Sequence, residues 1–322
     1  MKLVLLEETQ TACIAPGMPG TEDNRYGCEG GLVIKEDGQY HCFTTEVWGS
    51  PKLRKTRLAH WHSVDGLNFS RKSTAIAPGQ VAAGTVTDAK EPWTPYPIYN
   101  EAEGRWNLFY TGYGSPIGSI LRAASDVPGR SGISGPWTPI DSPTAPSADK
   151  VFRQGNSFFP FRAGGRWMAF FGHNTYSAKT TRDDWRFFVS LASAPSLNGP
   201  WEPINQSAPV LMDERFVENP VVHELSPGKF ITLYDGETVH GIAYATSSNG
   251  VDWNREQVLW LSSPPTPWAW HMRTPLGLVH EKDDIYSLYY TAFDYEEPHP
   301  REQPLYHYGF GRLGRVTVRV VD

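Results

Sequence analysis

The sequence predicts an all-β protein, a five-bladed β-propeller whose four-stranded antiparallel blades surround a central channel. Three observations lead to this fold class. The first is composition, because aromatic residues make up 13% of the 322 residues and 30 Gly and 27 Pro interrupt the chain. Such a mixture favours many strands joined by tight turns over long helices. The second is a repeated hairpin, and the third is a further repeated signal that follows each hairpin in a fixed phase.

The repeated hairpin consists of an apolar strand, a tight turn and an aromatic-rich strand. Its first copy runs over residues 32–43, around Gly38. The same pattern recurs around four more turn residues, Gly104, Gly165, Gly228 and Asp284, at spacings of 66, 61, 63 and 56 residues. Five such units fill the chain, so we expect a single domain that covers residues 1–322.

The further signal is a strand, a turn with Gly and an aromatic residue, found at 59–69, 123–137, 192–201 and 245–253. Together with the hairpin it makes a four-stranded unit, and radial repetition of such units protects sheet edges in a propeller. The fifth unit instead ends in a strand at 315–320, which we expect to complete a sheet with an earlier part of the chain. A β-sandwich is the alternative, and the fixed phase of the two signals disfavours it.

Charge and cysteine content limit the partners and the compartment. The net charge is −6 and no long run of Lys or Arg occurs, so we expect no nucleic-acid partner. No apolar run approaches the roughly 18 residues of a membrane span, and the first residues lack the apolar region of about 7–15 residues that a signal peptide needs. Cys13, Cys28 and Cys42 have no metal-ligand spacing. We therefore expect a cytoplasmic protein, with secretion as the alternative if the chain was trimmed.

In a propeller, the residues that begin the innermost strand of each blade converge on one face of the channel. Carboxylates among them would suit sugar cleavage, in which one carboxylic acid protonates the leaving oxygen and a second carboxylate acts as base or nucleophile. The catalytic candidates at these positions are Glu29, Glu91, Asp88 and Glu218. The substrate-binding candidates are Trp93, Asn156, Trp270, His271 and Arg273.

Structural roles for the same residues stay open. Glu218 could have no role beyond a salt bridge to Arg215 or Arg273. The glycines that follow Glu29 could mark a tight turn of the backbone. His271 could be a hydrogen-bonded structural histidine, a sugar contact or a ligand of a central divalent cation. We expect no other cofactor, and the sequence indicates no oligomeric state.

The repeat, with its Ser-x-Asp-Gly and Gly-Pro-Trp turns, resembles the five-bladed propeller glycosidases of glycoside hydrolase family 43 and its relatives. Glu218-Asn219-Pro220 matches the Glu-x-Pro segment in which such families carry the general acid on blade four. The blade-one base of the family is an Asp before Pro, where this chain has Gly30-Gly31 with Glu29 one residue earlier. The blade-two Asp that tunes the acid aligns with Thr94, so the chain resembles a divergent relative.

The resemblance implies a glycoside hydrolase that cleaves a short oligosaccharide or a glycan side chain, as in polysaccharide degradation, and that is exo-acting and inverting. Inversion requires carboxyl groups about 6.5–9.5 Å apart. We therefore expect Glu29 and Glu218 to face each other across the channel, with Arg273 close to one of them. Glu91 or Asp88 should lean toward Glu218 in place of the absent Asp.

Two other functions stay open. A glycoside phosphorylase would bind phosphate in place of water, and Arg273, His271, Arg215 and Arg153 are the cationic candidates. A non-catalytic carbohydrate-binding propeller would account for the missing blade-two Asp. Phosphate-dependent release of a sugar 1-phosphate would identify the first, and binding without product would identify the second.

Overall fold

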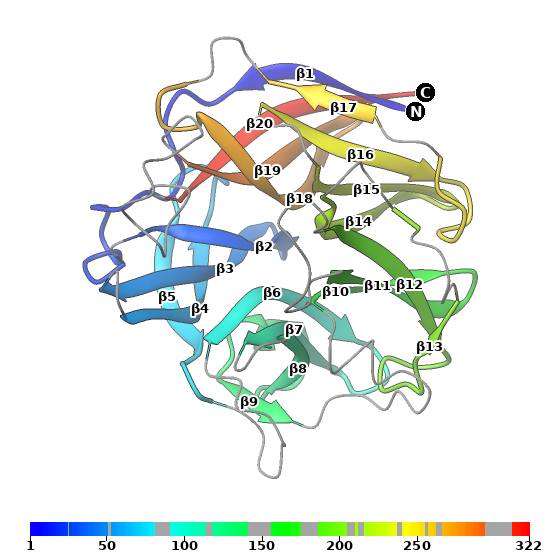
Figure 1. The fold of residues 1–322 in the computed structure, drawn as a ribbon, viewed down its shortest axis with the longest axis horizontal. Helices are drawn as coiled ribbons and strands as arrows, with labels where there is room; N and C mark the ends of the chain where they lie inside the picture. The colour runs from blue at the N-terminus through cyan, green and yellow to red at the C-terminus, as the bar shows by residue number, and fades with distance from the viewer. Residues whose placement is uncertain are drawn as a thin grey trace.

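The computed structural model describes residues 1–24, 26–50, 53–80, 91–113, 118–140, 156–174, 186–204, 210–211, 216–236, 240–254, 257–261, 266–293 and 311–322. These residues form five four-stranded antiparallel sheets that are arranged in a ring (Figure 1). The predicted five-bladed propeller is confirmed, and each predicted hairpin forms two adjacent strands of one blade. Within these ranges, no helix has the length and apolar character needed to cross a membrane.

The blades follow one another in chain order. Blade one contains β2 (Cys28–Glu36), β3 (Gln39–Ser50), β4 (Leu53–Ser63) and β5 (Ser70–Ile76). Blade two contains β6 (Glu91–Asn100), β7 (Arg105–Tyr113), β8 (Gly118–Ser125) and β9 (Trp137–Ile140), with the 3-10 helix η1 (Arg130–Ser134) before β9. Blade three contains β10 (Asn156–Ala163), β11 (Arg166–Asn174), β12 (Phe187–Ala194) and β13 (Glu202–Pro203). Blade four contains β14 (Glu218–Ser226), β15 (Lys229–Asp235), β16 (Gly241–Ser247) and β17 (Gln257–Trp260).

Blade five is closed by both ends of the chain. It contains β18 (His271–Lys282), β19 (Ile285–Phe293) and β20 (Arg312–Val321), and its fourth strand is β1 (Lys2–Glu8). β1 runs antiparallel to β20, with Lys2 opposite Val321 and Glu8 opposite Val316. The two termini therefore lie side by side in Figure 1. The expectation that the last strand pairs with an earlier part of the chain is confirmed.

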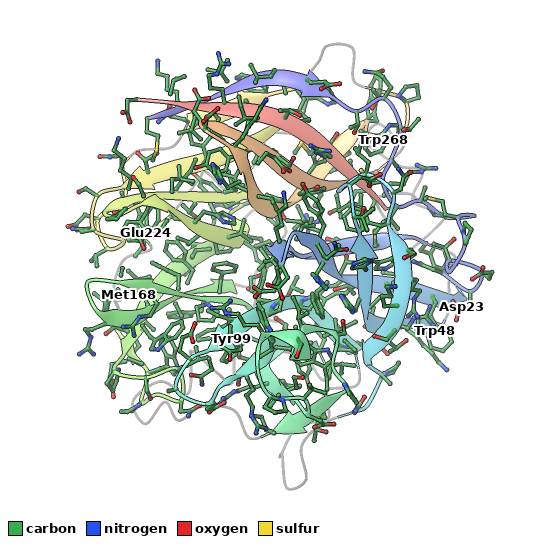
Figure 2. All side chains as sticks on the ribbon, turned by 180° about the vertical axis from the view of Figure 1, so that it is seen from behind. Asp23, Trp48, Tyr99, Met168, Glu224 and Trp268 are labelled. Atoms are coloured by element: carbon green, nitrogen blue, oxygen red, sulfur yellow. The ribbon has the colours of Figure 1, made fainter. Side chains whose placement is uncertain are left out.

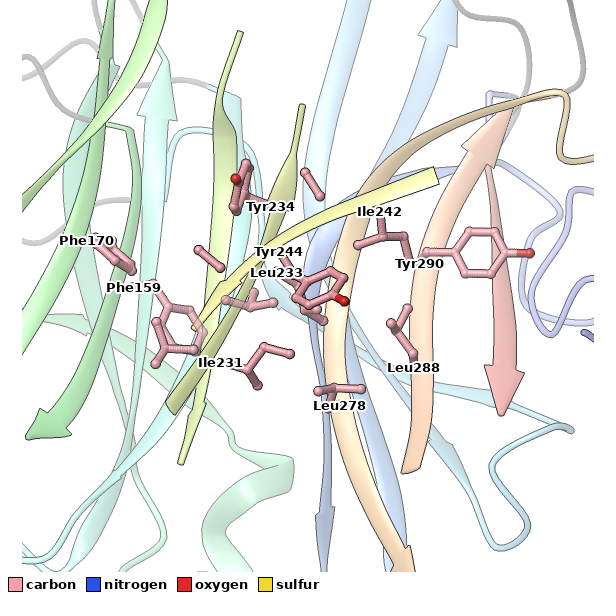
Figure 3. Close-up of a cluster of buried hydrophobic side chains, with 14 of the residues drawn as sticks. Phe159, Phe170, Ile231, Leu233, Tyr234, Ile242, Tyr244, Leu278, Leu288 and Tyr290 are labelled. Carbon is pink, nitrogen blue, oxygen red and sulfur yellow. The ribbon is translucent and has the colours of Figure 1, made fainter. Parts of the chain in front are cut away.

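The burial of each strand reflects its place in the ring. The middle strands β7 and β19 are buried along almost their whole length, because other blades pack on both faces of their sheets. The outer strand β5 instead alternates between exposed and half-buried residues over its first part. A buried apolar cluster joins blades three, four and five, where Phe159, Phe170, Ile231 and Leu288 pack together (Figure 3). Trp106 in β7 is 4% exposed.

A buried ion-pair network fastens the segment before β2 to blade one. Glu46 is fully buried and accepts from Arg57 Nε at 2.6 Å and Arg71 Nε at 2.9 Å. The Arg57 guanidinium also contacts Asp23 at 2.6 Å and lies over the ring of Trp48. Figure 2 shows Asp23 and Trp48 close together at the rim of the molecule. Since both oxygens of Glu46 are paired with arginines, we assign this carboxylate a structural role.

Two histidines of blade one are buried as a hydrogen-bonded pair. His41 Nδ1 lies 2.9 Å from His60 Nε2, and the ring of His60 stacks on Phe43 at 4.5 Å. Burial lowers the pKa of His41 to about 4 and the pKa of His60 to about 3. Both rings are therefore neutral in the folded protein near neutral pH.

We expect His60 to make the fold sensitive to acid. Its folded-state pKa of about 3 lies below the ordinary value of 6.5, so stability is lost as the pH falls from 6.5 toward 3. The loss is at most about 1.4 kcal/mol per pH unit for one such group. His60→Phe keeps a ring beside Phe43 and should flatten the pH dependence of the free energy of unfolding, measured by urea denaturation between pH 4 and pH 7. The exposed His280→Gln variant is the control, and equal slopes in wild type and His60→Phe would contradict the prediction.

Candidate active site at the propeller axis

A β-bulge interrupts the start of the inner strand in every blade. In the first four blades it contains one residue with positive φ: Gly30 (66°), Thr94 (47°), Ser157 (49°) and Asn219 (51°). In blade five the register shifts between Met272 and Thr274, around Arg273. Bulges re-aim side chains and locally end the pairing of a strand. The residues beside these bulges, among them Glu29, Asn156 and Glu218, contact one another between blades.

One guanidinium joins the two carboxylates that the sequence predicts for catalysis. Arg273 Nε donates to Glu29 Oε1 at 2.7 Å, and Arg273 Nη2 donates to Glu218 Oε2 at 3.0 Å. The exposed fractions of the three side chains are 16%, 14% and 11%, in that order. The guanidinium also lies over the ring of Phe216, 5.1 Å from its centre. Arg273 therefore contacts both carboxylates, whereas we expected one, because its neighbouring nitrogens Nε and Nη2 each carry a donor.

The second oxygen of Glu218 is also held. Asn156 Nδ2 donates to Glu218 Oε1 at 3.3 Å and lies 3.5 Å from the hydroxyl of Tyr113. Burial raises the pKa of Glu218, the positive charge of Arg273 opposes this, and the negative charge of Glu29 adds to it. The net direction is upward, which favours a Glu218 that retains a proton.

A third carboxyl group, which the sequence analysis did not select, lies next to Glu218. Asp235 stands opposite Glu218 in the β14–β15 ladder and is 3% exposed. Its Oδ2 accepts hydrogen bonds from Asn219 Nδ2 at 2.8 Å and Thr274 Oγ1 at 3.3 Å. A search confined to the starts of inner strands misses it, because it ends the second strand. Its signal in the sequence is its place opposite Glu218 in the same hairpin.

Glu91, one of the two acids expected from blade two, does not reach this cluster. Glu91 Oε2 accepts from the backbone N–H of Thr56 and from its hydroxyl at 2.9 Å, so this carboxylate is bound to strand β4 of blade one. Glu91 therefore does not take the place of the missing Asp beside Glu218. Glu91 lies two residues before Trp93, where the bulge of blade two begins. It is therefore not one of the residues that the bulge re-aims. Asp88 lies outside the described residues.

The other predicted binding residues lie in blades two and five. Trp93 directly precedes the positive-φ residue of blade two, as Glu218 does in blade four, and it packs half-buried against Tyr26 and Val47. Trp270 is half-buried and makes an edge-on contact with His240.

His271 is neutral near neutral pH. Burial is the main cause that lowers its pKa to about 4, and the charge of Arg273 adds to the effect. Among the described residues, no three His, Cys, Asp or Glu side chains are placed to hold a metal ion. A divalent cation near His271 therefore has no support from this part of the chain. Arg153 and Arg215, which we considered for phosphate, lie outside the described residues.

Hydrogen bonds between neighbouring blades hold the bulges in place. The backbone N–H of Thr94 donates to Thr45 Oγ1 of blade one at 2.8 Å. The backbone N–H of Ser157 donates to Thr111 Oγ1 of blade two at 3.2 Å, and the Ser157 hydroxyl donates to Asn219 Oδ1 of blade four at 2.8 Å. Each inner strand is thus positioned by the blade beside it.

No family model matches the sequence, and no curated protein matches it. Solved structures match over nearly the whole chain. One is a structure from the glycoside hydrolase family 130 of mannoside phosphorylases. This family contains glycoside hydrolases that target β-1,2 mannosidic linkages in Candida mannan. The structure has a TM-score of 0.66 at 15% identity, and the match covers 97% of this chain and 92% of that chain.

Two further structures extend this comparison. A family 117 glycoside hydrolase from the marine bacterium Zobellia galactanivorans has a TM-score of 0.63 at 13% identity, over 100% of this chain and 92% of that chain. A family 43 enzyme from Xanthomonas citri in complex with xylotriose has a TM-score of 0.62 at 14% identity, over 95% and 91%. The resemblance to five-bladed propeller glycosidases is confirmed at the level of the fold.

We expect Arg273→Gln to destabilise the protein in a pH-dependent way. Without the cation, the buried carboxyl group of Glu218 binds its proton more tightly when folded, so stability falls as the pH rises. The loss should reach about 3–5 kcal/mol near pH 8 and be smaller at pH 5. Urea denaturation at both pH values measures it, with the exposed Arg162→Gln as control. An equal loss at both pH values would argue against the ion-pair account.

Proposed function

We propose that this chain is a glycoside hydrolase that cleaves a glycosidic bond of a short oligosaccharide or a glycan side chain, in an exo-acting and inverting manner. The observation that carries the proposal is the meeting of Glu29 and Glu218 at one guanidinium, on the axis of a fold shared with glycoside hydrolases. A pair of carboxyl groups is the equipment that glycoside hydrolysis requires.

The two carboxyl groups have different environments, which supports different roles. Glu218 is the buried member with the raised pKa, and we assign it the general acid that protonates the leaving oxygen. Glu29 accepts the proton of the attacking water, so the reaction leaves Glu29 protonated and Glu218 ionised until solvent exchange restores both. The inverting outcome follows from the resemblance to inverting propeller glycosidases, in which a water fits between the base and the sugar.

Uncharged groups around this pair suit sugar hydroxyls and sugar faces. Trp93 and Trp270 offer ring surfaces on which the C–H face of a sugar can stack. Asn156 and the neutral His271 offer hydrogen-bonding groups without charge. The reaction uses protein carboxyl groups and water, so no cofactor forms part of the proposal.

We expect Glu218→Gln and Glu29→Gln each to lower kcat by about 10²–10⁴-fold, because each removes one proton-transfer group. Panels of aryl-glycosides and of natural oligosaccharides measure the effect. Glu218→Gln should lose less on aryl-glycosides, whose leaving groups need less protonation. Glu91→Gln is the matched control and should stay close to wild type, because Glu91 is bound to Thr56. Full activity of Glu218→Gln on natural oligosaccharides would remove the acid assignment.

Phosphorolysis is the second candidate function, because one structural neighbour is described within a family of mannoside phosphorylases. In this chain Arg273 is already paired with two carboxylates, which leaves its charge compensated. We therefore expect the rate of glycoside cleavage to be the same with and without inorganic phosphate. Chromatography of the products should show a free sugar. A sugar 1-phosphate formed only with phosphate present would establish a phosphorylase, and binding in calorimetry without any product would establish a non-catalytic sugar-binding protein.

A further inference from the structure

One oxygen of the Asp235 carboxyl group links the strand that carries Glu218 to the strand that carries Arg273. Its Oδ2 accepts from Asn219, the residue after Glu218, and from Thr274, the residue after Arg273. Asn219 belongs to β14 and Thr274 to β18, so this oxygen spans blades four and five. The position of Glu218 relative to Arg273 therefore depends on Asp235.

The other oxygen of Asp235 is in a different situation. Oδ1 is buried and has no hydrogen-bond partner within the described part of the chain. An ionised carboxylate with a buried, unpartnered oxygen is costly, whereas a neutral carboxylic acid costs far less. Glu46 of blade one shows the contrast, because each of its oxygens is paired with an arginine.

The groups that face Asp235 carry charges of both signs, and burial outweighs them. Arg273 faces it from β18, Glu218 from β14 and Glu29 from β2, and the phenol of Tyr96 faces it from β6. Arg273 therefore already pairs with two carboxyl groups, those of Glu29 and Glu218, before its attraction to Asp235 is considered. Burial is the largest cause that raises the pKa of Asp235 well above its ordinary value of 3.8. The charge of Arg273 and the hydrogen bond from Asn219 oppose it, and the charges of Glu218 and Glu29 add to it.

We propose that Asp235 is a positioning residue of this site and acts as a neutral carboxylic acid, with Oδ2 fixing Glu218 against Arg273 and Oδ1 carrying the proton. This inference rests on the proposed function, because the pair that Asp235 positions is the proposed catalytic pair. An ionised Asp235 would draw Arg273 away from its two partners.

Two substitutions separate the contacts of Asp235 from its charge. Asp235→Asn keeps an acceptor oxygen for Asn219 and Thr274 and places an N–H donor where the acid carries its proton. Its kcat should stay within about threefold of wild type, with an unchanged pH profile. Asp235→Val removes the acceptor, and kcat should fall by about 10–100-fold. If Asp235→Val folds poorly, the isosteric Thr274→Val removes one of the two contacts and should give a smaller fall of the same kind.

The activity measurement also contains the result that would overturn the proposal. If Asp235 were ionised in the working enzyme, Asp235→Asn would remove a negative charge beside Glu218. The limb of the pH profile that reports Glu218 would then move down by about one pH unit.

A stability measurement tests the protonation state without any need for activity. Wild type must take up a proton at Asp235 on folding, because the folded-state pKa lies above that of the unfolded chain. Stability from this group is therefore full at low pH and is lost as the pH rises, while Asp235→Asn has no such loss. The ratio of the two unfolding equilibrium constants should grow by up to about tenfold per pH unit above pH 4, measured by urea denaturation.

Asp65→Asn serves as a control of opposite sign. Asp65 Oδ1 accepts from the backbone N–H groups of Leu67 and Asn68, which lowers the pKa of Asp65 below its ordinary value. Asp65→Asn should therefore lose stability relative to wild type as the pH rises toward about 4, and the difference should stay constant above pH 4, where the Asp235 series changes. A constant difference between Asp235→Asn and wild type across the pH range would overturn the neutral-acid proposal. A wild type that cleaves no glycoside would count against the proposed function alone, since the stability series still reports on Asp235.

Discussion

Arg273 lies between carboxylates from blades one and four, and this contact exists because five inner strands begin around one narrow axis. Residues separated by more than half the chain therefore share a floor that is largely shielded from water. Charges attract and repel more strongly there than at a surface. Proton loss at one carboxyl group then changes the affinity of the others for their protons. The chemistry of the floor belongs to the whole cluster, in which Arg273 faces Glu29, Glu218 and Asp235.

The bulges show how local backbone and ring assembly depend on each other. Thr94 and Ser157 hold positive φ, a conformation that side chains with a Cβ rarely adopt. The backbone N–H groups of these two residues donate to Thr45 Oγ1 and Thr111 Oγ1 of the preceding blades. The unusual conformation is thus supported by the neighbouring blade. A blade on its own would lack these partners, so the floor takes its shape from the assembled ring.

The blades could be predicted from the sequence because strand periodicity and turn glycines are local signals. Glu29 and Glu218 could be found as well, since counting back from an apolar strand core reaches the start of an inner strand. The role of Glu91 could not be found in this way, because Glu91 lies before the bulge and is bound to another blade. Asp235 could not be found in this way, because its role depends on Glu218 in the opposite strand and on hydrogen bonds with side chains from two blades.

The closure of blade five has a consequence for how the chain is made. On the ribosome β1 emerges before β2–β20, so it stays without its partner β20 until the other strands of the ring have been made. This strand carries the apolar side chains of Val4 and Leu6, which are 42% and 45% exposed even in the finished ring. An unpaired apolar strand is a site where nascent chains associate wrongly. β1 therefore needs protection during translation if the folded protein is to form in good yield. This need ends when β20 leaves the exit tunnel and the ring closes.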